Sequence, residues 1–177
     1  MTPLENQKNK VITDQFEPGS TFKIVAATAA LNTGKISLND EFNCEVGKFE
    51  FDGWTISDHE KFGVLTFPQI IANSSNVGVI KIAQIIGKEP LYRLSRDYGF
   101  GTPTGISFPG ESQGILRQKK DWSKMSLASV SIGYEVGVTA LQIASAYSAI
   151  ANGGVLLKPQ IVMQIISNKG ELLFKSK

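Results

Sequence analysis

Apolar side chains recur every three or four residues in several stretches of the chain, which is the period of an amphipathic helix. Glycines follow these stretches, at Gly34, Gly87, Gly99 and Gly153, where glycine commonly ends a helix. The pattern predicts helices over residues 20–31, 66–72, 77–86, 89–98 and 139–152. We expect the last helix to belong to the core, because its apolar residues share one face.

Short apolar runs separated by turn residues predict β-structure in two places. Asp52-Gly53 favours a tight hairpin turn, and we expect the neighbouring Phe49, Phe51 and Trp54 to form a small satellite core instead of a ligand platform. Near the C-terminal end, the apolar runs 161–166 and 172–174 predict a terminal β-hairpin. The chain is therefore expected to be a helix-rich α/β protein of the α+β type.

Composition fits one folded unit and argues against two classes of function. The chain has 177 residues, of which 42% are hydrophobic and 19% charged, enough for one core of ordinary domain size. Its net charge is only +2 and its lysines are scattered, so nucleic-acid binding has little support. No run approaches the roughly 20 apolar residues of a membrane span. The single Cys44 cannot form an internal disulfide, and we expect it to be free and buried.

The candidate chemistry centres on Ser20 and Lys23. Residues three apart on a helix share a face, with about 5–6 Å between Cβ atoms, so this serine and lysine can share a proton. A position in the first turn would expose Ser20 to backbone N–H groups that favour developing negative charge. Apolar neighbours would lower the pKa of Lys23 and make it a base. Taken alone, however, this spacing more often means a capping serine and a surface lysine.

A polar quartet, residues 73–76, falls between two predicted helices. Ser74 could relay a proton, and the Asn76 amide could orient Lys23 or hold a substrate carbonyl. Serine and asparagine are also preferred helix caps, and the two roles are compatible.

Ser20-x-x-Lys23 together with Ser74-x-Asn76 resembles two of the three motifs of the penicillin-recognising serine enzymes. Four longer stretches look like the transpeptidase domain of class B penicillin-binding proteins, and the likeness runs from about residue 9 to 154. These stretches are residues 17–23, 97–101, 108–111 and 131–142. The resemblance implies the helix-rich part of that fold, with a partial antiparallel sheet.

The resemblance also implies a reaction and a location. Ser20 would attack the D-Ala-D-Ala carbonyl of a peptidoglycan stem peptide, with Lys23 as base, Ser74 as proton relay and Asn76 as orienting amide. β-Lactam antibiotics would acylate Ser20 as substrate mimics, and no metal or cofactor is needed. The parent protein would be anchored in the bacterial cell membrane with this domain on the extracytoplasmic face, in a cell-wall synthesis complex serving cell division or cell shape.

The third family motif, Lys-Thr/Ser-Gly, does not occur in the sequence. Asn32-Thr33-Gly34-Lys35 has the letters in the wrong order, and Lys175-Ser176-Lys177 lacks the glycine. We therefore expect residues 1–177 to be a single partial transpeptidase domain, without the membrane anchor, the pedestal domain and the C-terminal strands. A lost oxyanion-hole donor costs about 100–1,000-fold in rate, so the chain alone should be weakly active or inactive. An open sheet edge would also let it self-associate.

Two other functions fit the same residues. One is a serine β-lactamase-like hydrolase that uses water as acceptor, and the other is a non-catalytic β-lactam-sensing or protein-binding module. A catalytic pair of Ser20 with His59 is less favoured, because no spacing places His59 near the serine. Asp58 and Glu60 are expected to be solvated charges, not a metal site or an acid–base pair.

Overall fold

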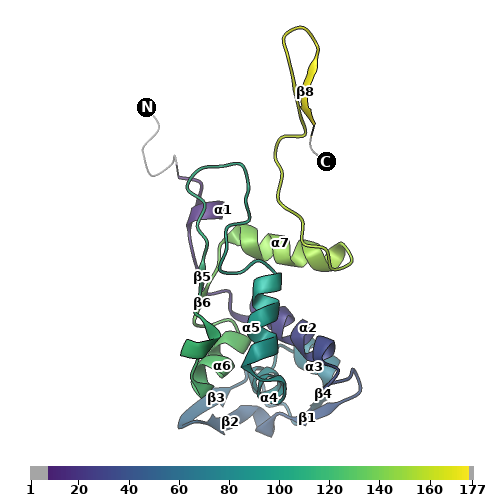
Figure 1. The fold of residues 1–177 in the computed structure, drawn as a ribbon. Helices are drawn as coiled ribbons and strands as arrows, with labels where there is room; N and C mark the ends of the chain where they lie inside the picture. The colour runs from purple at the N-terminus through teal and green to yellow at the C-terminus, as the bar shows by residue number, and fades with distance from the viewer. Residues whose placement is uncertain (1–7, 176–177) are drawn as a thin grey trace.

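The computed structural model describes residues 8–175 and contains a helical body with short strand pairs at its margins (Figure 1). The helices are α1 Lys10–Thr13, α2 Lys23–Thr33, α3 Phe67–Ala72, α4 Asn76–Ile86, α5 Lys88–Asp97, α6 Lys124–Ser131 and α7 Ala140–Ala151, with 3₁₀ turns η2 Gly19–Phe22, η3 Glu45–Gly47 and η4 Lys119–Asp121. None of these helices is long and apolar enough to cross a membrane.

The described strands form antiparallel pairs that are each only two strands wide. The pairs are β1 Glu41–Asn43 with β4 Val64–Thr66, β2 Lys48–Phe51 with β3 Trp54–Ser57, β5 Ile115–Leu116 with β6 Val136–Gly137, and β7 Gln164–Ile166 with β8 Leu172–Lys175. This combination of helices and short antiparallel strands confirms the predicted α+β class.

Helix α4 lies at the centre of the core. It is apolar around most of its circumference, and Val77, Val79, Ile80 and Ile82 are almost completely buried. Such a helix needs cover on all sides, and α2, α5 and α6 supply it. At Gly78 a Cβ would meet the side chain of Ile70, so the glycine allows α3 to approach α4 closely.

The predicted helices are present, with small shifts at their ends. The helix expected over residues 20–31 is the η2 turn followed by α2, which Gly34 ends in a left-handed conformation with φ 66°. Gly87, with φ 80°, ends α4 as predicted. Residues 101–114 contain no helix or strand and form a loop rich in Gly, Pro, Ser and Thr.

The β2–β3 hairpin turns at Asp52 and Gly53, both with positive φ, as the sequence predicts. Phe49 and Phe51 pack against the core with their rings 6.0 Å apart, in line with the satellite core. The expectation was wrong for Trp54, which is 63% exposed. Trp54 is the first residue of β3, directly after the Asp52-Gly53 turn.

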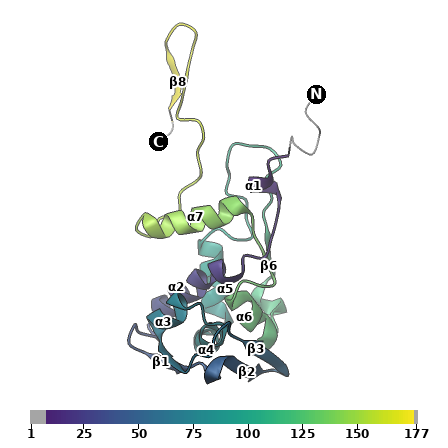
Figure 2. The same cartoon turned by 180° about the vertical axis from the view of Figure 1, so that it is seen from behind.

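Helix α7 packs at the edge of the main core, and the last hairpin lies apart from it (Figures 1 and 2). Along α7 the buried residues are Gln142, Ala146 and Ala149, whereas Tyr147 and Ile150 are more than 40% exposed. The prediction of a core helix was therefore right for only one narrow face. The predicted terminal hairpin is present as β7–β8, and it projects away from the body with both strands exposed.

Candidate active site

Ser20 lies on the exposed surface of η2, one turn before the buried Lys23. The turn begins at Gly19, which has φ 56° and whose N–H donates to the Gly133 carbonyl at 3.0 Å. A Cβ at Gly133 would overlap the backbone of Gly19, so the two main chains are in direct contact. The segment before the turn is fixed as well, because Phe16 forms a β-bridge with Val138.

A second contact holds the same turn from the side of α7. The Tyr147 hydroxyl donates a hydrogen bond of 3.0 Å to the carbonyl oxygen of Thr21, the residue after Ser20. Burial raises the pKa of the Tyr147 hydroxyl, and nearby Tyr98 adds to the effect, so the group stays a protonated donor at neutral pH. The backbone of the serine turn is thus held by residues more than 100 positions away.

Lys23 is only 3% exposed, although it carries an amino group. Its Nζ donates to the Ser74 carbonyl at 2.5 Å, to Ser74 Oγ at 3.0 Å and to Asn76 Oδ1 at 2.7 Å. Desolvation lowers the pKa of Lys23 to about 8, against the opposing attraction of Asp58. The predicted apolar environment and lowered pKa of this lysine are therefore present.

The second motif forms the junction between α3 and α4. Ser74 adopts a left-handed conformation with φ 55°, Ser75 caps α4 by accepting from the N–H of Gly78, and Asn76 is the first residue of the helix. Asn76 also donates from Nδ2 to the Ser57 carbonyl at 2.9 Å. The amide is therefore oriented so that its oxygen faces Lys23. The middle serine is the cap, which leaves Ser74 and Asn76 free to contact the lysine.

The structure brings Lys23, Ser74 and Asn76 together as the sequence suggested. Within residues 8–175, the hydrogen bonds of the Lys23 ammonium do not include one to Ser20 Oγ. Serine–base hydrogen bonds are often long before substrate binds, so this geometry is compatible with a proton transfer that forms in the complex.

Asp58 was expected to be solvated, and that expectation was wrong. Its Oδ1 accepts from the backbone N–H groups of Asn76 and Val77, at 2.5 and 3.1 Å, and its Oδ2 accepts from Ser75 Oγ at 2.7 Å. The carboxylate therefore closes the N-terminus of α4, where backbone donors and the helix dipole favour negative charge. Sequence spacing could not reveal this contact, because the loop and the helix are joined only by the tertiary fold.

The remaining candidates play no part in this cluster. His59 is exposed and packs edge-on against Phe62, with ring centroids 5.5 Å apart, and Glu60 is exposed. No group of histidine, cysteine, aspartate and glutamate in the described part of the chain is arranged to hold a metal ion. Cys44 is free and buried, as predicted.

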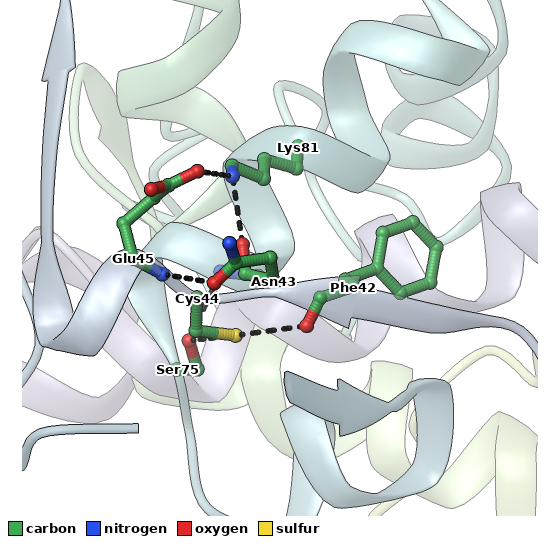
Figure 3. Close-up of polar contacts among 7 residues, drawn as sticks. Phe42, Asn43, Cys44, Glu45, Ser75 and Lys81 are labelled. Atoms are coloured by element: carbon green, nitrogen blue, oxygen red, sulfur yellow. Dashed lines mark hydrogen bonds and ion pairs between the residues drawn. The ribbon is translucent and has the colours of Figure 1, made fainter. Parts of the chain in front are cut away.

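The buried side of the second motif is packed against the segment from Phe42 to Glu45 (Figure 3). Ser75 Oγ lies 3.5 Å from Cys44 Sγ, and the thiol in turn lies 3.7 Å from the Phe42 carbonyl. Lys81 of α4 donates to two residues of this segment, to the Glu45 carboxylate at 2.6 Å and to the Asn43 carbonyl at 2.7 Å. These contacts tie α4 to β1 and η3 and keep the motif in place from behind.

The arrangement contains groups that acyl transfer through a serine requires. An exposed hydroxyl stands one turn from a buried amine whose pKa lies near neutrality, and a second hydroxyl and an amide bind that amine. These are the parts that an activated serine nucleophile needs: a base, a group that orients the base and a route for the proton.

The sequence matches the family model described as the penicillin binding protein transpeptidase domain, over residues 2–177. It is 40% identical over 150 residues to a probable peptidoglycan D,D-transpeptidase, PbpC, of Pseudomonas aeruginosa, covering 85% of this chain and 26% of that protein. It is 35% identical to the stage V sporulation protein D of Bacillus subtilis, covering 93% of this chain and 26% of that protein. The chain thus spans about a quarter of the length of these relatives.

Solved structures of similar sequence have the same fold. The transpeptidase domain of penicillin-binding protein 3 from Burkholderia pseudomallei superposes with a TM-score of 0.86 at 34% identity, covering 94% of this chain and 50% of that one. Penicillin-binding protein 3 of Mycobacterium tuberculosis in complex with ampicillin gives a TM-score of 0.87 at 34% identity, covering 96% of this chain and 37% of that one.

Proposed function

Because this chain belongs to the penicillin-binding protein transpeptidase family, we propose that it carries the acylation centre of a peptidoglycan D,D-transpeptidase. The observation that carries the proposal is the buried Lys23 ammonium, bound by Ser74 and Asn76 one turn after the exposed Ser20. The substrate is a stem peptide ending in D-Ala-D-Ala, and β-lactams bind the same residues.

Ser20 Oγ attacks the carbonyl carbon of the penultimate D-alanine, and neutral Lys23 takes the hydroxyl proton. Ser74, hydrogen-bonded to Lys23 Nζ, passes the proton to the departing D-alanine amine. An amine from a neighbouring strand then attacks the acyl-enzyme, and Ser20 leaves with a proton. Asn76 holds the lysine through Oδ1 before substrate arrives.

The whole protein acts at the bacterial cell membrane on its extracytoplasmic face, within a complex that builds the cell wall. This location follows from the family and from the peptidoglycan substrate. The 177 residues contain no Lys-Thr/Ser-Gly motif, so turnover by this chain alone is expected to be weak. Self-association through the exposed β7–β8 hairpin is part of the same proposal.

A non-catalytic β-lactam-sensing or protein-binding module is the second candidate function. A serine hydrolase of the β-lactamase type is the third possibility, because the same acyl-enzyme can react with water. The lifetime of the acyl-enzyme separates these functions. A long-lived adduct fits a penicillin-binding protein, whereas rapid loss of the adduct with release of hydrolysed penicillin fits a hydrolase.

Labelling with a fluorescent penicillin tests the proposal. We expect a covalent adduct on Ser20, located by intact mass and peptide mapping. The adduct should be absent in Ser20→Ala, and its formation should be about 100-fold slower or more in Lys23→Ala, the range that a general base contributes. Lys35→Ala, which removes an exposed lysine just beyond the C-terminal end of α2, should label like the wild type. Labelling that survives Ser20→Ala would refute the assignment.

A further inference from the structure

We infer that Asp58 is a positioning residue: its carboxylate holds the turn Ser74–Asn76 against Lys23 and supplies the negative charge that faces the Lys23 ammonium. The role assigned to Lys23 rests on the proposed function, but the position and charge of Asp58 do not. The hydrogen bonds of the Asp58 side chain in the described residues run to the second motif and the start of α4 and not to Ser20, so its effect on the site passes through the lysine.

The Asp58 carboxylate accepts hydrogen bonds from the three residues that follow the left-handed Ser74. One oxygen binds the amides of Asn76 and Val77, and the other binds the Ser75 hydroxyl. The carboxylate therefore fixes both the backbone and the cap of the first turn of α4. Because Ser74 has positive φ, a conformation that few non-glycine residues adopt, the turn needs such restraint from its surroundings.

The link from this turn to the lysine is short. Asn76 accepts from Lys23 through Oδ1 and donates through Nδ2 to the carbonyl of Ser57, the residue before Asp58. The loop at residues 57–58 thus binds Asn76 at its side chain and at its backbone N–H. If the loop moves, the amide that orients Lys23 moves with it.

Few other charges act near the lysine. Asp58 is the charged group whose attraction opposes the desolvation of Lys23. Behind the second motif, Glu45 and Lys81 form an ion pair with each other at 2.6 Å, and the Cys44 thiol stays neutral because burial raises its pKa. The protonation of Lys23 therefore depends on two opposing effects, burial and the Asp58 charge.

Removing the Asp58 charge removes the attraction that favours the ammonium, so the pKa of Lys23 should fall below its value of about 8. Asp58→Asn is the matched variant, because its amide oxygen can still accept from the α4 backbone. Asp58→Ser provides a second uncharged variant that keeps one acceptor for the helix amides.

The test is an NMR titration of the chain labelled with ¹³C at lysine Cε, with the Lys23 signal assigned by Lys23→Arg. We expect the Lys23 midpoint near 8 in the wild type and lower by about one pH unit in Asp58→Asn and Asp58→Ser. Glu60→Gln removes the same charge from an exposed position two residues away and should leave the midpoint unchanged. This readout needs no enzymatic activity, so a failure to bind penicillin would count against the proposed function and not against this inference.

Amide hydrogen exchange distinguishes a positioning role from a simple helix cap. In Asp58→Ala we expect the amides of Asn76 and Val77 to exchange at least about tenfold faster, because both lose their acceptor. If these amides exchange faster but the titration midpoint of Lys23 is unchanged in Asp58→Asn, Asp58→Ser and Asp58→Ala, Asp58 only caps α4 and the inference is overturned. A midpoint that moves equally in Glu60→Gln would overturn it too, by showing a non-specific charge effect.

Discussion

At the scale of single residues, the site depends on one amine that is kept out of water. Lys23 is buried among the core side chains of α2, and burial penalises its charged form. The ammonium is nevertheless bound by three oxygens, so its charged form remains accessible. The balance leaves a lysine that can accept a proton near neutral pH, which an exposed lysine cannot do.

This balance predicts the pH dependence of acylation. Lys23 must be neutral to accept the Ser20 proton, and its pKa is lowered to about 8. The rate of penicillin acylation should therefore rise with pH, by about tenfold per pH unit below 8, and level off above it. Stopped-flow or quench measurements between pH 6 and 9.5 would check this. A rate that is flat across this range would exclude Lys23 as the base.

The Tyr147 hydroxyl gives a second residue-level prediction. Tyr147→Phe removes the hydrogen bond to the Thr21 carbonyl but keeps the ring. We expect a loss of about 0.5–1.5 kcal/mol in the free energy of unfolding, together with slower labelling of Ser20. Tyr134→Phe is the control, because within residues 8–175 it is the Tyr147 hydroxyl, and not that of Tyr134, that donates a hydrogen bond to the serine turn. Urea unfolding measures the change in stability, and the labelling rate measures the effect on Ser20. If Tyr147→Phe and Tyr134→Phe have the same stability and the same labelling rate, the Tyr147 hydroxyl does not hold the serine turn.

At the scale of elements, much of the structure follows from local signals. Asp52-Gly53 forms the expected hairpin turn, and Gly34 and Gly87 end α2 and α4 because they adopt positive φ. The Ser20–Lys23 spacing follows from one helix start, so the sequence shows it directly. Contacts between distant segments leave no such pattern. The Asp58 carboxylate, the Tyr147 hydroxyl and the narrow buried face of α7 all depend on which elements become neighbours.

The contact between Gly19 and Gly133 can be tested at the element scale. Gly133 and Gly170 both have φ 84°, but a Cβ at Gly133 would overlap the Gly19 backbone, whereas a Cβ at Gly170 meets nothing within 4 Å. Alanine at either site therefore carries the same backbone strain. We expect Gly133→Ala to lose about 1–3 kcal/mol more stability than Gly170→Ala. Thermal unfolding of both variants measures the difference. Equal losses of stability would mean that the backbones at Gly19 and Gly133 are not in tight contact.

At the scale of the whole molecule, one end of the chain exposes apolar surface. The β7–β8 hairpin projects from the body, and Ile165, Leu173 and Phe174 are each about half exposed or more. Soluble monomers rarely keep such patches uncovered, and an open strand edge can pair with another chain. The hairpin is therefore the part of the molecule where association is expected.

The 177-residue chain should show concentration-dependent association in sedimentation velocity, and Ile165→Lys should weaken it by placing a charge on the exposed strand. Lys158→Glu changes charge outside the hairpin and should have a smaller effect. A wild-type chain that stays monomeric at all concentrations would rule out association through this hairpin.

The residues that hold the serine turn lie in a different part of the sequence from the proposed acylating residues. Ser20, Lys23, Ser74 and Asn76 all precede the loop at residues 101–114, whereas Gly133 and Tyr147, which hold the serine turn, follow it. Cutting the chain in this loop would give one fragment with Ser20, Lys23, Ser74 and Asn76, and a second fragment with Gly133 and Tyr147, whose contacts hold the serine turn. Penicillin labelling of the first fragment would then report the presence of the second, so the domain could serve as a split reporter of two proteins brought together.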